Sequence, residues 1–137
     1  MAGELSVDDV ATVAEFRSAL RKFLRRSELV ADGCGLTPQR YLLLLMIKGA
    51  PDRSGRATVT DLAERLQLAQ STVTELVARG VDAGLIAREG SSSDARVSYL
   101  RLTPEGERRL ACSFTGLSAE RTALYEAIGS LRPKSAR

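Results

Sequence analysis

Two short amphipathic segments separated by only three residues restrict most strongly what this chain can fold into. Apolar residues recur at helical spacing in residues 58–66 and again in residues 70–82. Thr58 and Asp61 have the spacing of a capping pair at the start of the first segment. The linker between the two, residues 67–69, is short enough to hold two helices crosswise, as in a helix-turn-helix. In that arrangement the second helix can enter the major groove of DNA while the first crosses the backbone.

After the second of these helices, the apolar pattern changes from helical spacing to that of strands. Residues 85–88 and 97–102 are predicted to be two strands, and the polar segment 90–95 between them a hairpin turn. Helix, short turn, helix and two-stranded hairpin follow one another in the order of a winged helix-turn-helix. We therefore predict a mainly α fold with a small β-hairpin wing (α+β), in which the winged helix-turn-helix lobe covers residues 37–102.

Another helix is predicted at the start of this lobe. Thr37 suits the N-cap position and Pro38 the first helical position. The helix contains six consecutive apolar residues, 42–47. Because a helix that is apolar all round belongs in a protein core, we expect this one to be buried on every side.

Helical segments flank the lobe on both sides. Residues 6–32 carry one long apolar stripe, and residues 103–131 form a second helical region that bends or divides near Gly116. The two stripes hold more apolar residues than a compact winged lobe needs, so we expect them to be dimerisation helices in a homodimer. The alternative is that the first helix packs on the last within one chain. Either arrangement makes residues 1–137 a single domain.

Composition argues against catalysis more clearly than it argues for any partner. Histidine is absent, which removes the commonest general base and metal ligand, so we expect no enzyme, no cofactor and no metal site. Aromatic residues make up only 4% of the chain, which disfavours a stacking platform for single-stranded nucleic acid. The net charge is +3, and seventeen of the twenty basic residues are arginine. Arginine suits phosphates and base edges but equally carboxylates within a fold.

The chain also lacks the sequence features of a membrane or secreted protein. Its longest apolar run, residues 42–47, is far shorter than the ~20 residues that span a bilayer. No signal-peptide pattern precedes it, and we expect a cytoplasmic protein with no membrane partner. Two cysteines, Cys34 and Cys112, cannot form a disulfide framework or a four-ligand zinc site, and we expect small buried residues at both. The alternative is a redox sensor, which Arg108 and Arg109, one turn from Cys112, would support.

The segment from about Thr58 to Gly106 resembles the MarR family of bacterial winged-helix regulators. The matching motifs, in the family's order and spacing, are Leu62-Ala63-Glu64-Arg65-Leu66, Ser71-Thr72-Val73-Thr74-x-Leu76-Val77-x-Arg79, Gly84-Leu85-Ile86-x-Arg88, Asp94-x-Arg96 and Leu102-Thr103-Pro104-x-Gly106. The resemblance implies a sequence-specific regulator, a homodimeric repressor that binds a pseudo-palindromic operator in double-stranded DNA. It also implies release from DNA by a small ligand or, in some relatives, by cysteine oxidation.

The resemblance assigns roles to particular residues of this chain. The DNA-binding set comprises Gln70, Ser71, Thr72 and Thr74 on the major-groove face, Arg79 further along the same helix, and Arg96 on the wing. Arg79 would contact phosphate or form an ion pair on the helix surface. Asp94 would hold the wing arginines in place. A small aromatic or phenolic effector would enter a cleft for which the candidate residues are Phe16, Arg17, Phe23 and Tyr41.

Four positions depart from the family pattern. Ala69 lacks the side-chain oxygen that caps the second helix, Glu75 brings a negative charge to the DNA-facing surface, and Ala95 replaces a second wing arginine. Gly80 lies inside the helix where leucine is usual, at a cost of about 1 kcal/mol relative to alanine. Ala69, Glu75 and Ala95 motivate an alternative function, that of a winged-helix protein-interaction module with weak or no DNA binding.

Overall fold

The computed structural model describes residues 3–90 and 97–131. Six helices and three strands lie within these residues, in the order α1 (Val7–Gly33), α2 (Pro38–Lys48), β1 (Arg56–Ala57), α3 (Val59–Leu66), α4 (Gln70–Asp82), β2 (Ile86–Gly90), β3 (Ser98–Leu102), α5 (Pro104–Gly116) and α6 (Ser118–Gly129). The predicted fold class, mainly helical with a small β wing, is therefore confirmed. Within the described residues no helix combines the length and apolarity needed to cross a bilayer.

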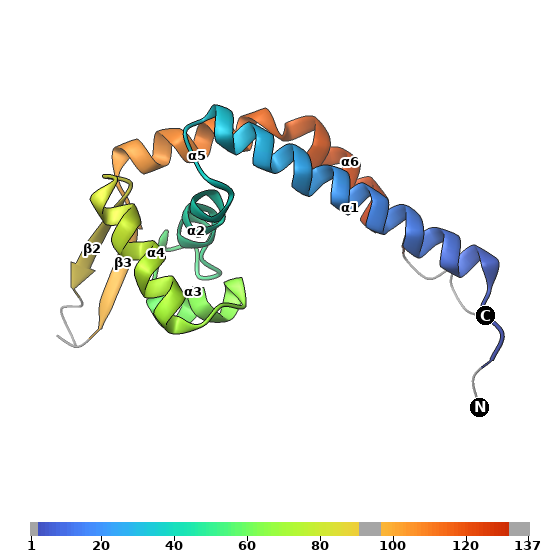
Figure 1. The fold of residues 1–137 in the computed structure, drawn as a ribbon, viewed down its shortest axis with the longest axis horizontal. Helices are drawn as coiled ribbons and strands as arrows, with labels where there is room; N and C mark the ends of the chain where they lie inside the picture. The colour runs from blue at the N-terminus through green and yellow to red at the C-terminus, as the bar shows by residue number, and fades with distance from the viewer. Residues whose placement is uncertain (1–2, 91–96, 132–137) are drawn as a thin grey trace.

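The molecule consists of an arm and a lobe (Figure 1). Helices α1 and α6 lie side by side and form the arm, which extends away from the rest of the chain. Helices α2, α3 and α4 and the sheet form the lobe, with α3 and α4 on the side turned away from the arm. Helix α5 follows directly from β3 and continues into α6, so it connects lobe and arm.

Side-chain caps explain why most of these helices begin where they do. The hydroxyl of Ser6 accepts a hydrogen bond from the backbone N–H of Asp9 at the start of α1. Thr58 and Asp61 form the complete reciprocal capping box predicted for α3, with both hydrogen bonds at 3.2 Å. Helices α6 and α4 are the exceptions, because Leu117 and Ala69 at their N-caps make no side-chain bond. Gln67, in the turn before α4, adopts a left-handed conformation, with φ of 56°.

The sheet has one strand more than the sequence predicts. Its order is β1-β3-β2, and both pairings are antiparallel. Ile86 pairs with Leu102 and Glu89 with Tyr99 in the predicted hairpin, while Arg56 pairs with Arg101 on the other edge of β3. The two-residue β1 is too short to leave an alternating pattern, so residues 56–57 carry no strand signal of their own.

Helix α2 is the centre of the core but is not buried on every side, and the prediction of complete burial was wrong. Leu43, Leu44 and Ile47 have no exposed surface, whereas Leu42 is 40% exposed. Leu45 and Met46 are half-buried. The neighbours of α2 (α1, α3, α4, α5, β1 and β3) surround most of its circumference and leave the strip at Leu42 open to solvent.

Two buried glycines allow elements of the lobe to approach closely. At Gly106, in the first turn of α5, an added Cβ would overlap the backbone carbonyl oxygen of Leu85. At Gly80, in α4, an added Cβ would lie 2.6 Å from the Cδ1 atom of Ile86 on β2. The glycine that departs from the family pattern in α4 therefore makes room for the Ile86 side chain, and that packing offsets its cost in helix propensity.

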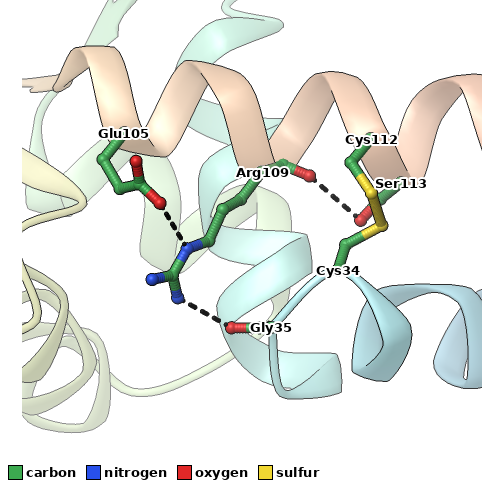
Figure 2. Close-up of a disulfide and its surroundings, with 6 residues drawn as sticks. All are labelled: Cys34, Gly35, Glu105, Arg109, Cys112 and Ser113. Atoms are coloured by element: carbon green, nitrogen blue, oxygen red, sulfur yellow. Dashed lines mark hydrogen bonds and ion pairs between the residues drawn. A yellow bond between two sulfur atoms is a disulfide. The ribbon is translucent and has the colours of Figure 1, made fainter.

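The two cysteines are joined in a disulfide, contrary to the expectation of two small buried thiols (Figure 2). Cys34 is the C-cap residue of α1 and is half-buried, and Cys112 lies in α5 and is exposed. Their Cα atoms lie 5.9 Å apart although the residues are 78 positions apart in sequence. Only the folding of α5 against the end of α1 brings the two sulfur atoms together.

Candidate nucleic-acid interface

Helix α4 buries one face against the lobe and exposes the other. Val73 and Val77 are buried and hold the helix in place. The structure brings five of the six predicted DNA-binding residues together on the exposed face, namely Gln70, Ser71, Thr72, Thr74 and Arg79. The sixth, Arg96, and the structural residue Asp94 lie outside the described residues.

The first turn of α4 combines exposed hydroxyls with uncapped backbone donors. Ser71, Thr72 and Thr74 are all exposed. Because Ala69 supplies no side-chain acceptor, the backbone N–H groups of the first turn remain available to an outside acceptor. Such a helix terminus attracts phosphate through these donors and through the positive end of the helix dipole. The missing cap therefore leaves the helix end open toward an anionic partner.

Two polar contacts position side chains on this face. The amide of Gln70 donates to the hydroxyl of Thr60 at 3.3 Å, which connects α4 with the first turn of α3. Arg79 and Glu75, one helical turn apart, form an ion pair at 2.6 Å, the second of the two roles predicted for Arg79. Both side chains are 64% exposed, so the pair adds little stability. Glu75 consequently holds Arg79 on the exposed face. A phosphate could replace the Glu75 carboxylate as the partner of Arg79 at a small cost in free energy.

The base of the wing carries an arginine cluster that the sequence does not single out. Arg101 on β3 donates to Glu89 on β2 at 2.9 Å, and Arg56 on β1 lies 3.7 Å from the same carboxylate. The hydrogen bond from Arg101 holds the pKa of Glu89 below its usual range. The guanidinium of Arg56 also lies 4.1 Å from the centroid of the Tyr99 ring. Arg56 joins this cluster only through β1, which explains why no local pattern reveals it.

Within the part of the chain that the structure describes, the four candidate effector residues do not line a common groove. An apolar groove of about 500 Å³ between α1 and α6 is lined by Phe23 together with Glu15, Ser18, Ala19, Lys22, Glu120, Ala123 and Leu124. Phe16, Arg17 and Tyr41 are not among its lining residues. Tyr41 is only 6% exposed, and burial raises the pKa of its hydroxyl, partly offset by a hydrogen bond with Ser27. Tyr41 is therefore a core residue of α2, whereas Phe23 borders a groove of the arm.

Similarity to known proteins agrees with this geometry. Residues 35–97 match the MarR family profile. The HTH-type transcriptional repressor MdtR of Bacillus subtilis (strain 168) is 36% identical over 73 residues, which cover 53% of this chain and 44% of that protein. The repressor YetL of the same organism is 29% identical over 94 residues, covering 69% and 55%. The chain thus spans about half the length of the curated relatives it matches. The activity for which both relatives are named, transcriptional repression, is non-enzymatic.

Solved structures share the fold over most of the chain. AbsC, a MarR family transcriptional regulator from Streptomyces coelicolor, has a TM-score of 0.70 at 20% identity, covering 96% of this chain and 95% of that one. The arrangement of arm, lobe and wing is therefore that of known MarR structures. Together these findings show that residues 35–97 match the MarR family and that the chain has the winged helix-turn-helix fold of MarR structures.

Proposed function

We propose that this protein is a transcriptional regulator that binds a specific sequence in double-stranded DNA and represses transcription. The observation that carries the proposal is the exposed face of α4, where Ser71, Thr72 and Thr74 surround an uncapped helix N-terminus. Two findings on related proteins support it. Both curated relatives are named as transcriptional repressors, and a mutant MarR from E. coli has been solved complexed with operator DNA.

In this proposal, contacts to phosphates and contacts to base edges have separate tasks. The backbone donors of the α4 N-terminus, Arg79 and the wing residue Arg96 neutralise phosphates and supply most of the affinity. Gln70 and the three hydroxyls reach base edges in the major groove and supply specificity. Arg79 exchanges its exposed partner Glu75 for a phosphate when DNA binds.

The regulator responds to a small aromatic or phenolic acid, for which the groove beside Phe23 is the candidate entry point.

A single amino-acid change on α4 tests DNA binding. Because the operator is unknown, the protein is first used to select duplexes from genomic fragments, and the enriched sequence should be a palindrome. Thr72→Ala is then expected to weaken binding to that duplex by roughly 5-fold to 100-fold, since one base contact contributes about 1–3 kcal/mol. Fluorescence anisotropy over a range of salt concentrations measures the change.

Thr115→Ala is the matched control for this experiment, because Thr115 is also an exposed helical threonine but lies on α5. Its affinity should stay within about twofold of the unmodified protein, as expected for a residue that contacts no DNA. Equal affinities for the two variants would remove α4 from the interface. If no duplex is enriched and binding does not depend on salt, the protein-interaction module becomes the better proposal.

We further propose that the regulator is a homodimer formed through the arm. Helices α1 and α6 already pack on each other within one chain, as the intramolecular alternative predicts, and Leu117 is fully buried there without a partner. Large apolar side chains nevertheless remain exposed along the arm and at its junction with α5, namely Val10, Val13, Leu24, Leu29, Phe114, Tyr125 and Ile128. So many exposed apolar residues along one region are typical of an interface. A dimer would place two α4 helices on one face of DNA, about 34–36 Å apart.

Sedimentation equilibrium tests the dimer. The expected particle mass is twice the chain mass of 14.8 kDa. Tyr125→Glu, which places a charge on the exposed arm, is expected to shift the mass toward that of one chain. A change to glutamate at the exposed Thr115 is the control, and it should leave the mass unchanged. A particle of 14.8 kDa at all concentrations for the unmodified protein would contradict the proposal.

A further inference from the structure

The Cys34–Cys112 disulfide lies where the arm meets the lobe (Figure 2). Cys34 ends α1, and only three residues separate it from α2, the first helix of the lobe. Cys112 lies in the second half of α5, which leads out of the lobe into the arm. The bond therefore ties the segment that enters the lobe to the helix that leaves it.

The two ends of α5 are held in different ways. At its first turn, the backbone N–H and hydroxyl of Thr103 donate to the carbonyl oxygens of Leu85 and Gly84, at 3.0 and 2.6 Å. Gly106 packs directly on the backbone of Leu85. This end of α5 is therefore fixed to the lobe, close to the wing. The disulfide adds a covalent attachment near the other end of the same helix.

The polar contacts beside the disulfide are exposed or partly buried, while Ala31, Leu36 and Leu110, within three positions of the two cysteines, belong to the buried core. Arg109 donates to the carbonyl oxygen of Gly35 at 3.0 Å and to the carboxylate of Glu105 at 2.9 Å. Gly116 packs closely against the side chain of Val30. These contacts keep α5 next to α1 when the disulfide is open. Since exposed polar contacts are weak, we expect the open joint to stay folded but to move more freely.

Neither cysteine is a buried residue, since Cys112 is exposed and Cys34 is half-buried. A protein that binds chromosomal DNA works where thiols are kept reduced, and disulfides in that environment are usually transient. This step rests on the proposed function. A structural disulfide would be expected to be shielded within the core, whereas this one joins two residues that are not buried.

We propose that Cys34 and Cys112 are a reversible oxidation site that senses peroxides and controls the freedom of the arm–lobe joint. The Cys112 thiolate attacks one oxygen of a peroxide, ROOH. The S–O bond forms as the O–O bond breaks, the departing RO⁻ takes a proton from water to become ROH, and Cys112 becomes a sulfenic acid. The Cys34 thiol then attacks the Cys112 sulfur, forming the S–S bond and releasing water. In the reverse direction a dithiol reductant supplies two electrons and two protons, becomes a disulfide itself and restores both thiols.

The surroundings assign different roles to the two cysteines. Cys34 caps the C-terminal end of α1, where the helix dipole places partial negative charge that opposes an anion. Cys112 has the cationic side chains of Arg108 and Arg109 on the preceding turn of its own helix. Glu105, which forms ion pairs with both arginines, is the acidic group nearest to them. Cys112 is therefore the attacking cysteine and Cys34 the resolving one.

The first experiment follows the thiols and needs no DNA. Hydrogen peroxide added to the reduced protein is expected to convert two titratable thiols per chain to none, and dithiothreitol to restore both. Cys34→Ser treated with peroxide should hold a sulfenic acid at Cys112 that a 1,3-dione reagent labels, whereas Cys112→Ser should stay unlabelled. If thiols are not lost, or if the label appears equally in both variants, the proposed site or the proposed roles are wrong.

The second experiment measures DNA binding by the same unmodified protein in its two redox states, so no variant has to fold. Circular dichroism first verifies that both states keep their helices. Affinity for the selected duplex is expected to differ by about fivefold or more, the lower end of the usual range of allosteric coupling. The Cys34→Ser, Cys112→Ser double variant should not respond to peroxide.

Equal affinities in the two states would overturn control of the joint while leaving DNA binding intact. Reversible thiol loss without DNA binding in either state would overturn the proposed function but not the oxidation site.

Discussion

Leu44→Ala is expected to lower the free energy of unfolding by about 3–5 kcal/mol, the cost typical of a leucine deleted from a closed core. Leu44 has no exposed surface and belongs to the central cluster that α2 forms with the surrounding helices and the sheet. The alanine would leave a cavity bordered by several elements, which cannot all move inward together. Urea unfolding at one fixed protein concentration measures the loss, since dimerisation makes stability depend on concentration.

Leu42→Ala is the matched control, because it makes the same change two residues earlier in the same helix. Leu42 is 40% exposed, and alanine is the better helix former, so a loss of about 1 kcal/mol or less is expected. Equal losses for the two variants would mean that α2 is buried on all sides, as its apolar sequence alone predicts. The difference between them therefore tests the observed orientation of α2.

Gly106→Ala is expected to be the second most damaging change, with a loss of about 2–4 kcal/mol. The new Cβ would overlap the backbone carbonyl oxygen of Leu85, which cannot rotate away as a side chain can. Leu85 is itself fully buried, and its carbonyl oxygen accepts the hydrogen bond from Thr103. Either α5 or the segment before β2 would have to shift. Urea unfolding measures the stability, and selected-duplex binding should weaken as well because α5 connects the lobe to the arm.

Gly129→Ala provides the comparison, because this glycine ends α6 and an added Cβ meets nothing within 4 Å. Alanine there should be neutral or stabilising by up to about 1 kcal/mol through helix propensity. If Gly106→Ala were equally harmless, the close contact between α5 and Leu85 would not exist in solution. A loss at both positions would point to a general intolerance of the chain rather than to this contact.

Much of the lobe could be predicted because its signals are local. The capping box of Thr58 and Asp61 and the three-residue linker define the helix-turn-helix over short stretches of chain. Alternation in residues 97–102 predicts β3 in the same way. The exposed face of α4 follows from helical spacing, and the resemblance to the MarR family names the major-groove residues on that face. Their contact with DNA stays a prediction.

Other features could not be predicted, because they join residues that are distant in sequence. The two-residue β1 exists only because Arg56 meets Arg101 on β3, and the arginine cluster on Glu89 follows from that pairing. The four candidate effector residues have the right chemical character, but no local signal tells Phe23, which lines a groove, from Tyr41, which fills the core.

The sequence by itself determined the order of the helices and of strands β2 and β3, the capped ends and the outward face of α4, because periodicity and capping act over a few residues. Only the tertiary structure decided which side of α2 stays open, why Gly80 and Gly106 are glycines, and that Cys34 meets Cys112 across 78 positions. These features depend on how whole elements pack on one another, such as α4 on β2 at Gly80 and α5 on Leu85 at Gly106. Such packing is the sum of many long-range contacts, and no short stretch of the chain encodes it.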